Sequence, residues 1–235
     1  MKSYGIDAMC CHFQRPGWLI ATVATLLCAG SDVLHAQQVR CFSLEFFYDS
    51  GVDDAVELQL ALVEFAAKRT GLRLHFRDVR ESEEMRKRVD EIAKYFRLPE
   101  VKLPAIYGLK NVLMDLTTRE QIQTRLEQIL TLTAYVQNGC PHCRAARVFF
   151  SKHGSRYPAL KIIYREVVTD RTARDDMDEL TRRYRRTAAS LPVVHYCNGL
   201  TIGFDRESTT GRRIMQTLDF WSKACSTENR AATRQ

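Results

Sequence analysis

The sequence predicts an α/β protein made of two tandem copies of one βαβαββα unit, each with a four-stranded mixed sheet flanked by helices. The first observation is an internal repeat with an offset of 88 residues, which pairs Gly51 with Gly139 (139 − 51) and Pro104 with Pro192 (192 − 104). The second is that both copies show the same order of strand and helix patterns. The third is a Cys-Pro-His-Cys motif at residues 140–143, where a strand turns into a helix in the second copy.

The repeat extends through most of both copies without a gap. Paired residues share size, charge or hydrophobicity, and so many matches indicate a tandem duplication. The same offset pairs Leu74, Phe76, Arg77, Asp78 and Val79 with Ile162, Tyr164, Arg165, Glu166 and Val167.

In the first copy, apolar, aromatic or alternating residues indicate strands, and apolar residues three and four positions apart indicate helices. Ser82 and Thr118 stand before the second and third helical patterns, where their side chains can accept hydrogen bonds from the first free N–H groups. The predicted elements are strand 42–48, helix 52–69, strand 72–79, helix 82–96, strands 105–109 and 112–116, and helix 118–130.

The second copy repeats this order. Pro141 suits the first turn of its first helix, because the N–H that proline lacks would be unpaired there. Asn198 and Gly199 predict a tight turn between its last two strands. The predicted elements are strand 132–136, helix 141–153, strand 160–168, helix 172–186, strands 193–196 and 201–204, and helix 211–223.

The chain length of 235 residues suits two domains of about 100 residues each, which we expect at 37–131 and 132–225, followed by a flexible tail at 226–235. Residues 1–36 have the pattern of a signal peptide, with sparse positive charge, an apolar run of about a dozen residues and cleavage after Ala36. A start at Met9 would give a signal of more ordinary length. We therefore expect export to the periplasm or another extracytoplasmic space. The alternative is a membrane anchor formed by an uncleaved N-terminal segment.

A basic cluster stands at the end of the predicted helix 172–186, in a chain whose formal net charge is +7. We interpret it as a solvated helix end, where cations interact favourably with the helix dipole. No series of stacking aromatic residues accompanies the charge, and export also argues against a nucleic-acid partner. The cluster consists of Arg182, Arg183, Arg185 and Arg186 around Tyr184.

Eight cysteines are present, of which three lie in the predicted signal peptide and two in the motif. The remaining three are Cys41, Cys197 and Cys225. An oxidising compartment would permit one disulfide among them and one free thiol. The sequence leaves that pairing open.

The motif has the spacing of a redox dithiol. Cys140 is predicted at the mouth of a helix, where free N–H groups and the helix dipole stabilise a thiolate, so we expect it to be the nucleophile. Cys143 lies one turn later on the same side and is expected to be the more buried resolving thiol. His142 would stabilise the thiolate further if its ring approaches the sulfurs, and would otherwise be a plain surface residue.

The strand, the Cys-x-x-Cys at a helix start, and Leu191-Pro192 before a later strand together resemble the thioredoxin superfamily. The resemblance implies that Pro192 forms a cis peptide beside the dithiol and that backbone around Leu191 binds an extended substrate segment. Parts of 191–205 are similar to glutaredoxins, whereas the tetrapeptide resembles periplasmic oxidants of the DsbA type. The tandem as a whole resembles two-unit protein disulfide oxidoreductases and the N-terminal part of some peroxiredoxin reductases, in which an inactive half precedes an active one.

Departures from the glutaredoxin pattern argue against glutathione binding. No basic residue stands directly before the motif, Leu191 replaces a residue that is often polar, and Phe204 replaces a second glycine.

The first copy lacks both sulfurs, because the offset maps the motif onto residues 52–55, Val-Asp-Asp-Ala. We therefore expect a redox-inactive half that braces the pair or receives a partner. Asp53 and Asp54 are ordinary residues for the first turn of a helix, where carboxylates interact with the dipole. They are not expected to hold a metal or perform acid–base chemistry.

The favoured function is exchange of disulfides with exported proteins, in which a mixed disulfide forms at Cys140 and is resolved by Cys143, with a second protein restoring the redox state. No cofactor or metal is expected. Two alternatives remain: a substrate- or partner-binding module with a structural dithiol, and a protein that holds copper(I) through the thiolates and His142. Export and His142 favour an oxidant or isomerase, whereas the glutaredoxin-like half favours a reductant.

Overall fold

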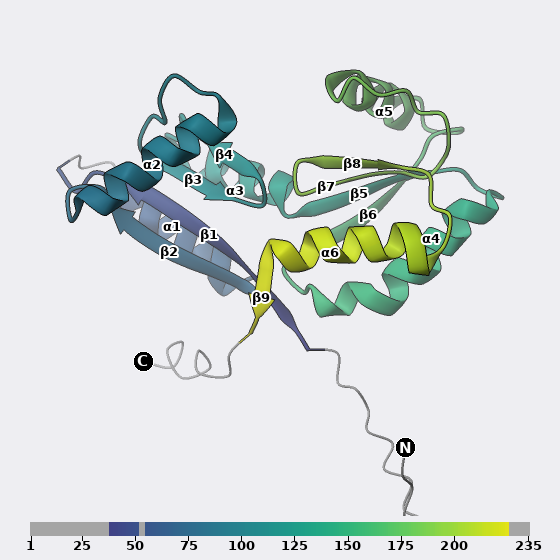
Figure 1. Cartoon of the computed structure of the whole chain (residues 1–235), viewed down its shortest axis with the longest axis horizontal. Helices are drawn as coiled ribbons and strands as arrows, with labels where there is room; N and C mark the ends of the chain where they lie inside the picture. The colour runs from purple at the N-terminus through teal and green to yellow at the C-terminus, as the bar shows by residue number, and fades with distance from the viewer. Residues whose placement is uncertain (1–37, 52–54, 226–235) are drawn as a thin grey trace, which may run out of the picture. The chain divides into compact units, whose positions relative to one another are not determined.

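The computed structural model describes residues 38–51 and 55–225. The predicted signal peptide at 1–36, the predicted tail at 226–235, and the carboxylates Asp53 and Asp54 lie outside the described residues. Within the described part, two sheets follow each other along the chain, one from each copy of the repeat (Figure 1). No helix in this part is both long and apolar enough to cross a lipid bilayer.

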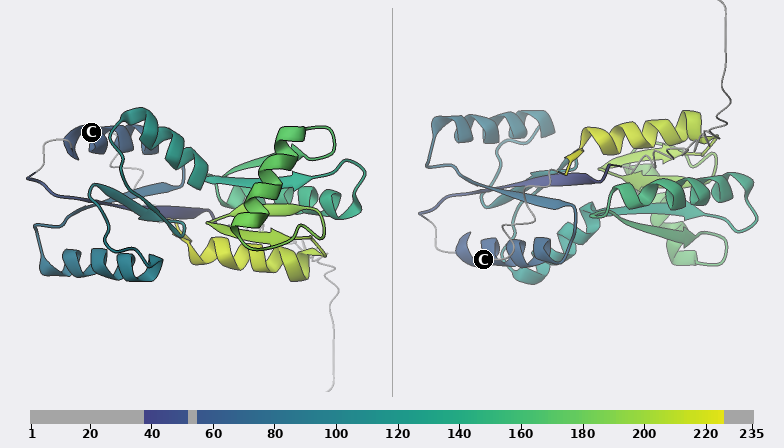
Figure 2. Two further views of the ribbon diagram at one scale, coloured as in Figure 1. Left: turned by 90° about the horizontal axis from the view of Figure 1, so that it is seen from above. Right: turned by 90° about the horizontal axis from the view of Figure 1, so that it is seen from below.

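The first copy folds into the elements β1 Arg40–Tyr48, α1 Ala55–Ala67, β2 Leu72–Asp78, α2 Glu83–Phe96, β3 Ala105–Gly108, β4 Asn111–Leu113 and α3 Arg119–Ile129. Strand β1 is central, with parallel β2 on one side and antiparallel β3 on the other, and β3 turns into β4. Helices α1 and α3 lie on one face of the sheet and α2 on the other (Figure 2). Alternation along β1 explains this, because Phe42, Leu44 and Phe46 pack with α1 and α3. Phe47 packs with α2 instead.

The second copy repeats this architecture with β5 Thr131–Val136, α4 Pro141–His153, β6 Lys161–Glu166, α5 Arg171–Arg183, β7 Val193–Tyr196, β8 Gly199–Ile202 and α6 Arg212–Phe220. The strand order is β6-β5-β7-β8, with β5 and β6 parallel and the other pairs antiparallel. Leu132, Ala134 and Val136 pack with α4 and α6, whereas Tyr135 faces α5. A π-helical turn, η2 Glu207–Gly211, precedes α6. The predicted fold class, two tandem thioredoxin-like units, is confirmed.

Equivalent positions share unusual backbone geometry. Leu109 and Lys110 in the first β-hairpin have left-handed φ angles of 48° and 59°, and their partners at offset 88, Cys197 and Asn198, have 46° and 45°. The two equivalent turns also touch, since the side-chain amide of Asn198 donates to the carbonyl of Lys110 at 3.0 Å. The duplication seen in the sequence is therefore also present in the backbone.

The end of the chain departs from the predicted pattern. The last helix, predicted to reach residue 223, ends at Phe220, and β9 Ser222–Ala224 pairs antiparallel with the start of β1. The first sheet therefore has a fifth strand that comes from the second copy, and β9 lies beside β1 in both views of Figure 2. The Ser222 hydroxyl donates to Leu218 O at 2.6 Å, and the Arg40 guanidinium donates to Ser222 O at 2.8 Å. These contacts hold the chain after α6 in an extended conformation paired with β1, where the sequence predicts that the helix continues.

A disulfide closes this junction. Cys41 in β1 and Cys225 directly after β9 are bridged, with their Cα atoms 5.2 Å apart, and Cys197 is free. The pairing that the sequence left open is thus Cys41 with Cys225. A cross-link between positions 184 residues apart removes much of the conformational freedom of the unfolded chain.

Replacing both Cys41 and Cys225 by alanine should lower the free energy of unfolding by about 2–5 kcal/mol, because the unfolded chain regains that freedom. The measurement is the guanidinium unfolding midpoint under non-reducing conditions. Cys197→Ala is the matched control, since it removes another buried sulfur and leaves the cross-link intact. A double variant as stable as this control would contradict the prediction.

Candidate dithiol site

The turn between β5 and α4 places the motif. Gly139 has a φ of +82°, a left-handed conformation that favours glycine, and it lets the chain reverse just before the helix. Cys140 is the N-cap of α4, and its sulfur accepts a hydrogen bond from the backbone N–H of Cys143 at 3.3 Å. Pro141 occupies the first helical position, where its missing N–H leaves no partner unsatisfied.

Cys140 is the more accessible sulfur of the pair and is half-buried. Partial burial alone would raise the pKa of its thiol. Hydrogen bonds from the Cys143 side chain and from the backbone N–H groups of Cys143 and His142 outweigh this and hold the pKa below its ordinary value. A thiolate at Cys140 is therefore stabilised by the start of α4.

Cys143 lies inside α4 with its side chain packed in the core, and it is only 1% exposed. Burial and its hydrogen bond to Cys140 raise the pKa of its thiol to about 11, although the backbone N–H of Gln137, which donates to its sulfur at 3.4 Å, acts in the opposite direction. The more accessible sulfur, that of Cys140, thus also belongs to the more acidic thiol. An external electrophile would reach Cys140 first.

His142 makes a contact that the sequence did not suggest. Its Nδ1 lies 2.9 Å from the carbonyl oxygen of Phe204, just after β8, and a nitrogen in that position donates its proton. The ring is therefore held by the loop that follows β8, with Nδ1 bonded to a carbonyl rather than to sulfur. Sequence patterns give no signal for such a backbone acceptor.

Leu191 and Pro192 precede β7 and are joined by a cis peptide bond, as are Leu103 and Pro104 in the first half. The register pairs Val193 with Tyr135, so Pro192 lies next to the C-terminal end of β5, where the dithiol turn begins. Pro192 is buried, and its carbonyl accepts the N–H of Gly203 at 2.8 Å. The fold thus brings the motif and the Leu191-Pro192 segment to the same edge of the sheet.

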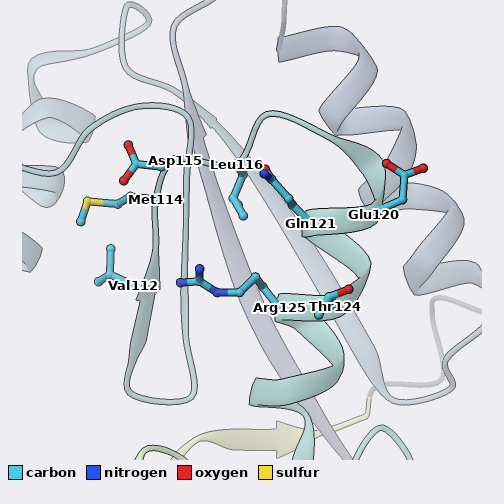
Figure 3. A pocket seen from close by; sticks show the side chains of 8 residues that line it. All are labelled: Val112, Met114, Asp115, Leu116, Glu120, Gln121, Thr124 and Arg125. Atoms are coloured by element: carbon cyan, nitrogen blue, oxygen red, sulfur yellow. The ribbon is translucent and has the colours of Figure 1, made fainter.

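Two surface hollows have volumes of about 420 and 430 Å³. The first adjoins the motif and is lined by Pro141, Arg144, Val148 and Phe204 among others. The second lies in the first half beside β4 and α3, where Arg125 extends from α3 toward the β3–β4 hairpin (Figure 3). None of its lining residues belongs to the dithiol turn or its first-half equivalent.

Other candidate groups are poorly suited to redox or metal chemistry. Burial raises the pKa of the Cys197 thiol to about 12, so this sulfur is both hidden and protonated near neutral pH. In the part of the chain that the structure describes, no three His, Cys, Asp or Glu side chains gather closely enough to hold a metal ion.

The first half has no thiol at the position of Cys143. Its equivalent there is Ala55, which is buried at the start of α1.

The sequence matches no protein-family profile and no curated protein. Among solved structures, it is similar to a glutaredoxin from Archaeoglobus fulgidus, with 14% identity and a TM-score of 0.28, over 40% of this chain and 92% of that one. It is also similar to the N-terminal domain of alkylhydroperoxide reductase AhpF from Enterococcus faecalis (15% identity, TM-score 0.24, 74% of this chain and 90% of that one). A protein disulfide oxidoreductase from Aeropyrum pernix matches at 16% identity and a TM-score of 0.22, over 74% of this chain and 84% of that one.

Alkylation of the reduced protein at neutral pH should modify Cys140 at least about tenfold faster than Cys143 or Cys197, because only Cys140 combines access with a lowered pKa. As pH rises, its rate should level off below the pH at which an ordinary cysteine does, since the thiolate is the reacting species. Iodoacetamide labelling followed by peptide mass spectrometry measures each site. Equal rates at Cys140 and Cys143 would overturn the assignment of the accessible thiolate.

Proposed function

We propose that the protein is an exported thiol–disulfide oxidoreductase that exchanges disulfides with protein substrates through Cys140 and Cys143. The observation that carries the proposal is the sulfur of Cys140 at the start of α4, half-exposed and accepting the Cys143 N–H, with a buried second thiol one turn away. A thiolate in this position is a nucleophile whose partner can close a disulfide behind it.

The reductive direction has two steps. The Cys140 thiolate attacks one sulfur of a substrate disulfide, so that a mixed disulfide forms and the other substrate sulfur leaves as a thiolate that takes up a proton. Cys143 then loses its proton and attacks the Cys140 sulfur, which forms the Cys140–Cys143 disulfide and releases the second substrate thiol. Two electrons pass from the protein to the substrate. The same steps in reverse oxidise a substrate dithiol.

The surroundings of the dithiol supply the means to hold a substrate. Leu191 stands just before β7 and is half-buried, so its backbone offers an extended segment a place to pair beside the motif. The hollow lined by Pro141, Arg144 and Val148 gives room for substrate side chains at the start of α4, which carries the motif. Both features suit a polypeptide rather than a small thiol, which agrees with the departures from the glutathione-binding pattern.

The proposed location is periplasmic or extracytoplasmic, with an uncleaved N-terminal anchor as the alternative. The Cys41–Cys225 disulfide supports an oxidising compartment, because structural disulfides persist there and are rare in the cytosol. A second protein that restores the redox state of the dithiol completes the proposed cycle.

Cys140→Ser should abolish catalysed exchange with a disulfide-containing peptide. Cys143→Ser should instead accumulate a mixed disulfide, because the first step remains and the second is lost. Loss of peptide oxidation or reduction and a mass shift of the trapped species are the readouts. Unchanged turnover in Cys140→Ser would refute the proposed enzyme and favour a binding module with a structural dithiol.

The reduction potential of the Cys140–Cys143 couple decides the direction. A value near roughly −120 mV identifies an oxidant and one near roughly −270 mV a reductant. Equilibration with glutathione redox buffers gives this value directly.

A further inference from the structure

We infer that Glu166 is the positioning residue for the dithiol turn. Its carboxylate accepts one backbone N–H from the turn, that of Asn138, and one from the segment after β6, that of Val168, and so ties the turn to the sheet. This inference rests on the proposed function, because it assigns Glu166 a role toward the Cys140–Cys143 couple. Glu166 is the last residue of β6, and it pairs in register with Val136, the last residue of β5 before the turn.

Both carboxylate oxygens of Glu166 are in use. The backbone N–H of Asn138 donates to Oε2 at 2.7 Å, and the backbone N–H of Val168 donates to Oε1 at 2.9 Å. The adjacent Arg165 forms its ion pairs with Asp170 and Asp176. An ionised carboxylate only accepts, so it can serve both donors, whereas a glutamine would turn its NH₂ group toward one of them.

Asn138, whose N–H Glu166 accepts, lies next to Gln137, which contacts both cysteines of the motif. Gln137, adjacent to Asn138, donates its N–H to the Cys143 sulfur at 3.4 Å, and its carbonyl accepts the N–H of Cys140 at 3.3 Å. Gly139 contributes no side chain that could brace the turn, and the space where its Cβ would lie is open. The carboxylate therefore fixes a short segment whose position sets the distance between the two sulfurs.

The first half contains the same device without a dithiol. Asp78 is the offset partner of Glu166 (166 − 78 = 88), and its Oδ1 accepts the N–H of Ser50 at 3.3 Å and the N–H of Arg80 at 2.9 Å. These donors are the offset partners of Asn138 and Val168 (138 − 50 and 168 − 80). Hydrogen bonds from Ser50 and from the Arg80 N–H hold the pKa of the Asp78 carboxyl below its ordinary range. An aspartate can thus do at this position what a glutamate does in the second half.

Loosening the turn should make closure of the Cys140–Cys143 disulfide less favourable. Closing a disulfide within a chain depends on the effective concentration of one sulfur near the other, and that concentration falls when the segment between strand and helix moves freely. Without the carboxylate, the Cys140–Cys143 disulfide should form less readily, and Cys143 should resolve a mixed disulfide more slowly.

The test compares Glu166→Gln, Glu166→Asp and Asp78→Asn in the full chain. Glu166→Gln should lower the equilibrium constant for closing the Cys140–Cys143 disulfide in glutathione buffers by about tenfold, and should slow resolution of a mixed disulfide to a similar extent. Glu166→Asp should restore both to within about threefold of wild type. Asp78→Asn should shift the denaturant midpoint as much as Glu166→Gln does, with wild-type dithiol equilibrium and exchange rates.

Equal redox effects of Glu166→Gln and Asp78→Asn would overturn the inference, as would a Glu166→Gln variant that loses stability with an unchanged dithiol equilibrium. The disulfide equilibrium is measured with glutathione alone, so it needs no catalytic turnover. If the wild-type protein fails to exchange disulfides with peptides, the proposed function falls, while the equilibrium still decides whether Glu166 positions the sulfurs.

Discussion

The hydrogen bond from the backbone N–H of Cys143 to the sulfur of Cys140 joins the chemistry of the site to the fold. It exists because Cys140 stands at the N-cap of α4, where the first N–H groups of a helix have no backbone partners. The residues on either side of Cys140 bring its sulfur to that place. The left-handed Gly139 allows the reversal, Pro141 starts the helix, and β5 delivers the chain to the edge of the sheet.

The duplication shows which parts of this arrangement belong to the fold and which to the chemistry. Both halves keep the strand order, the left-handed hairpin turns and a carboxylate that accepts a backbone N–H from the turn after the first strand. Only the second half has cysteines at the motif positions. At the position of Cys143 the first half has Ala55, a small, buried and unreactive residue. The first half has a mechanical role as well, since its sheet receives β9 and its Cys41 bonds the end of the chain.

Most of the fold could be predicted because its signals are local. Periodicity, capping residues and the offset of 88 identified the elements of both halves, and the motif could be located at a helix start from its neighbours alone. What escaped prediction depends on distant partners. Strand β9 forms because the start of β1 offers it a place to pair about 180 residues away along the chain. The local pattern alone predicts that the last helix continues to residue 223. The acceptor of His142 is a backbone carbonyl, and the donors to Glu166 are backbone N–H groups, neither of which side-chain identity reveals.

The bond between Cys41 and Cys225 also changes the topology of the molecule. Both folded halves lie almost wholly between these two cysteines, so the backbone and the disulfide together form one closed covalent ring. A protease that cuts once anywhere inside this ring opens it into a linear chain without releasing a fragment. Two cuts are needed to separate the halves, so a single nick leaves them covalently joined through the disulfide.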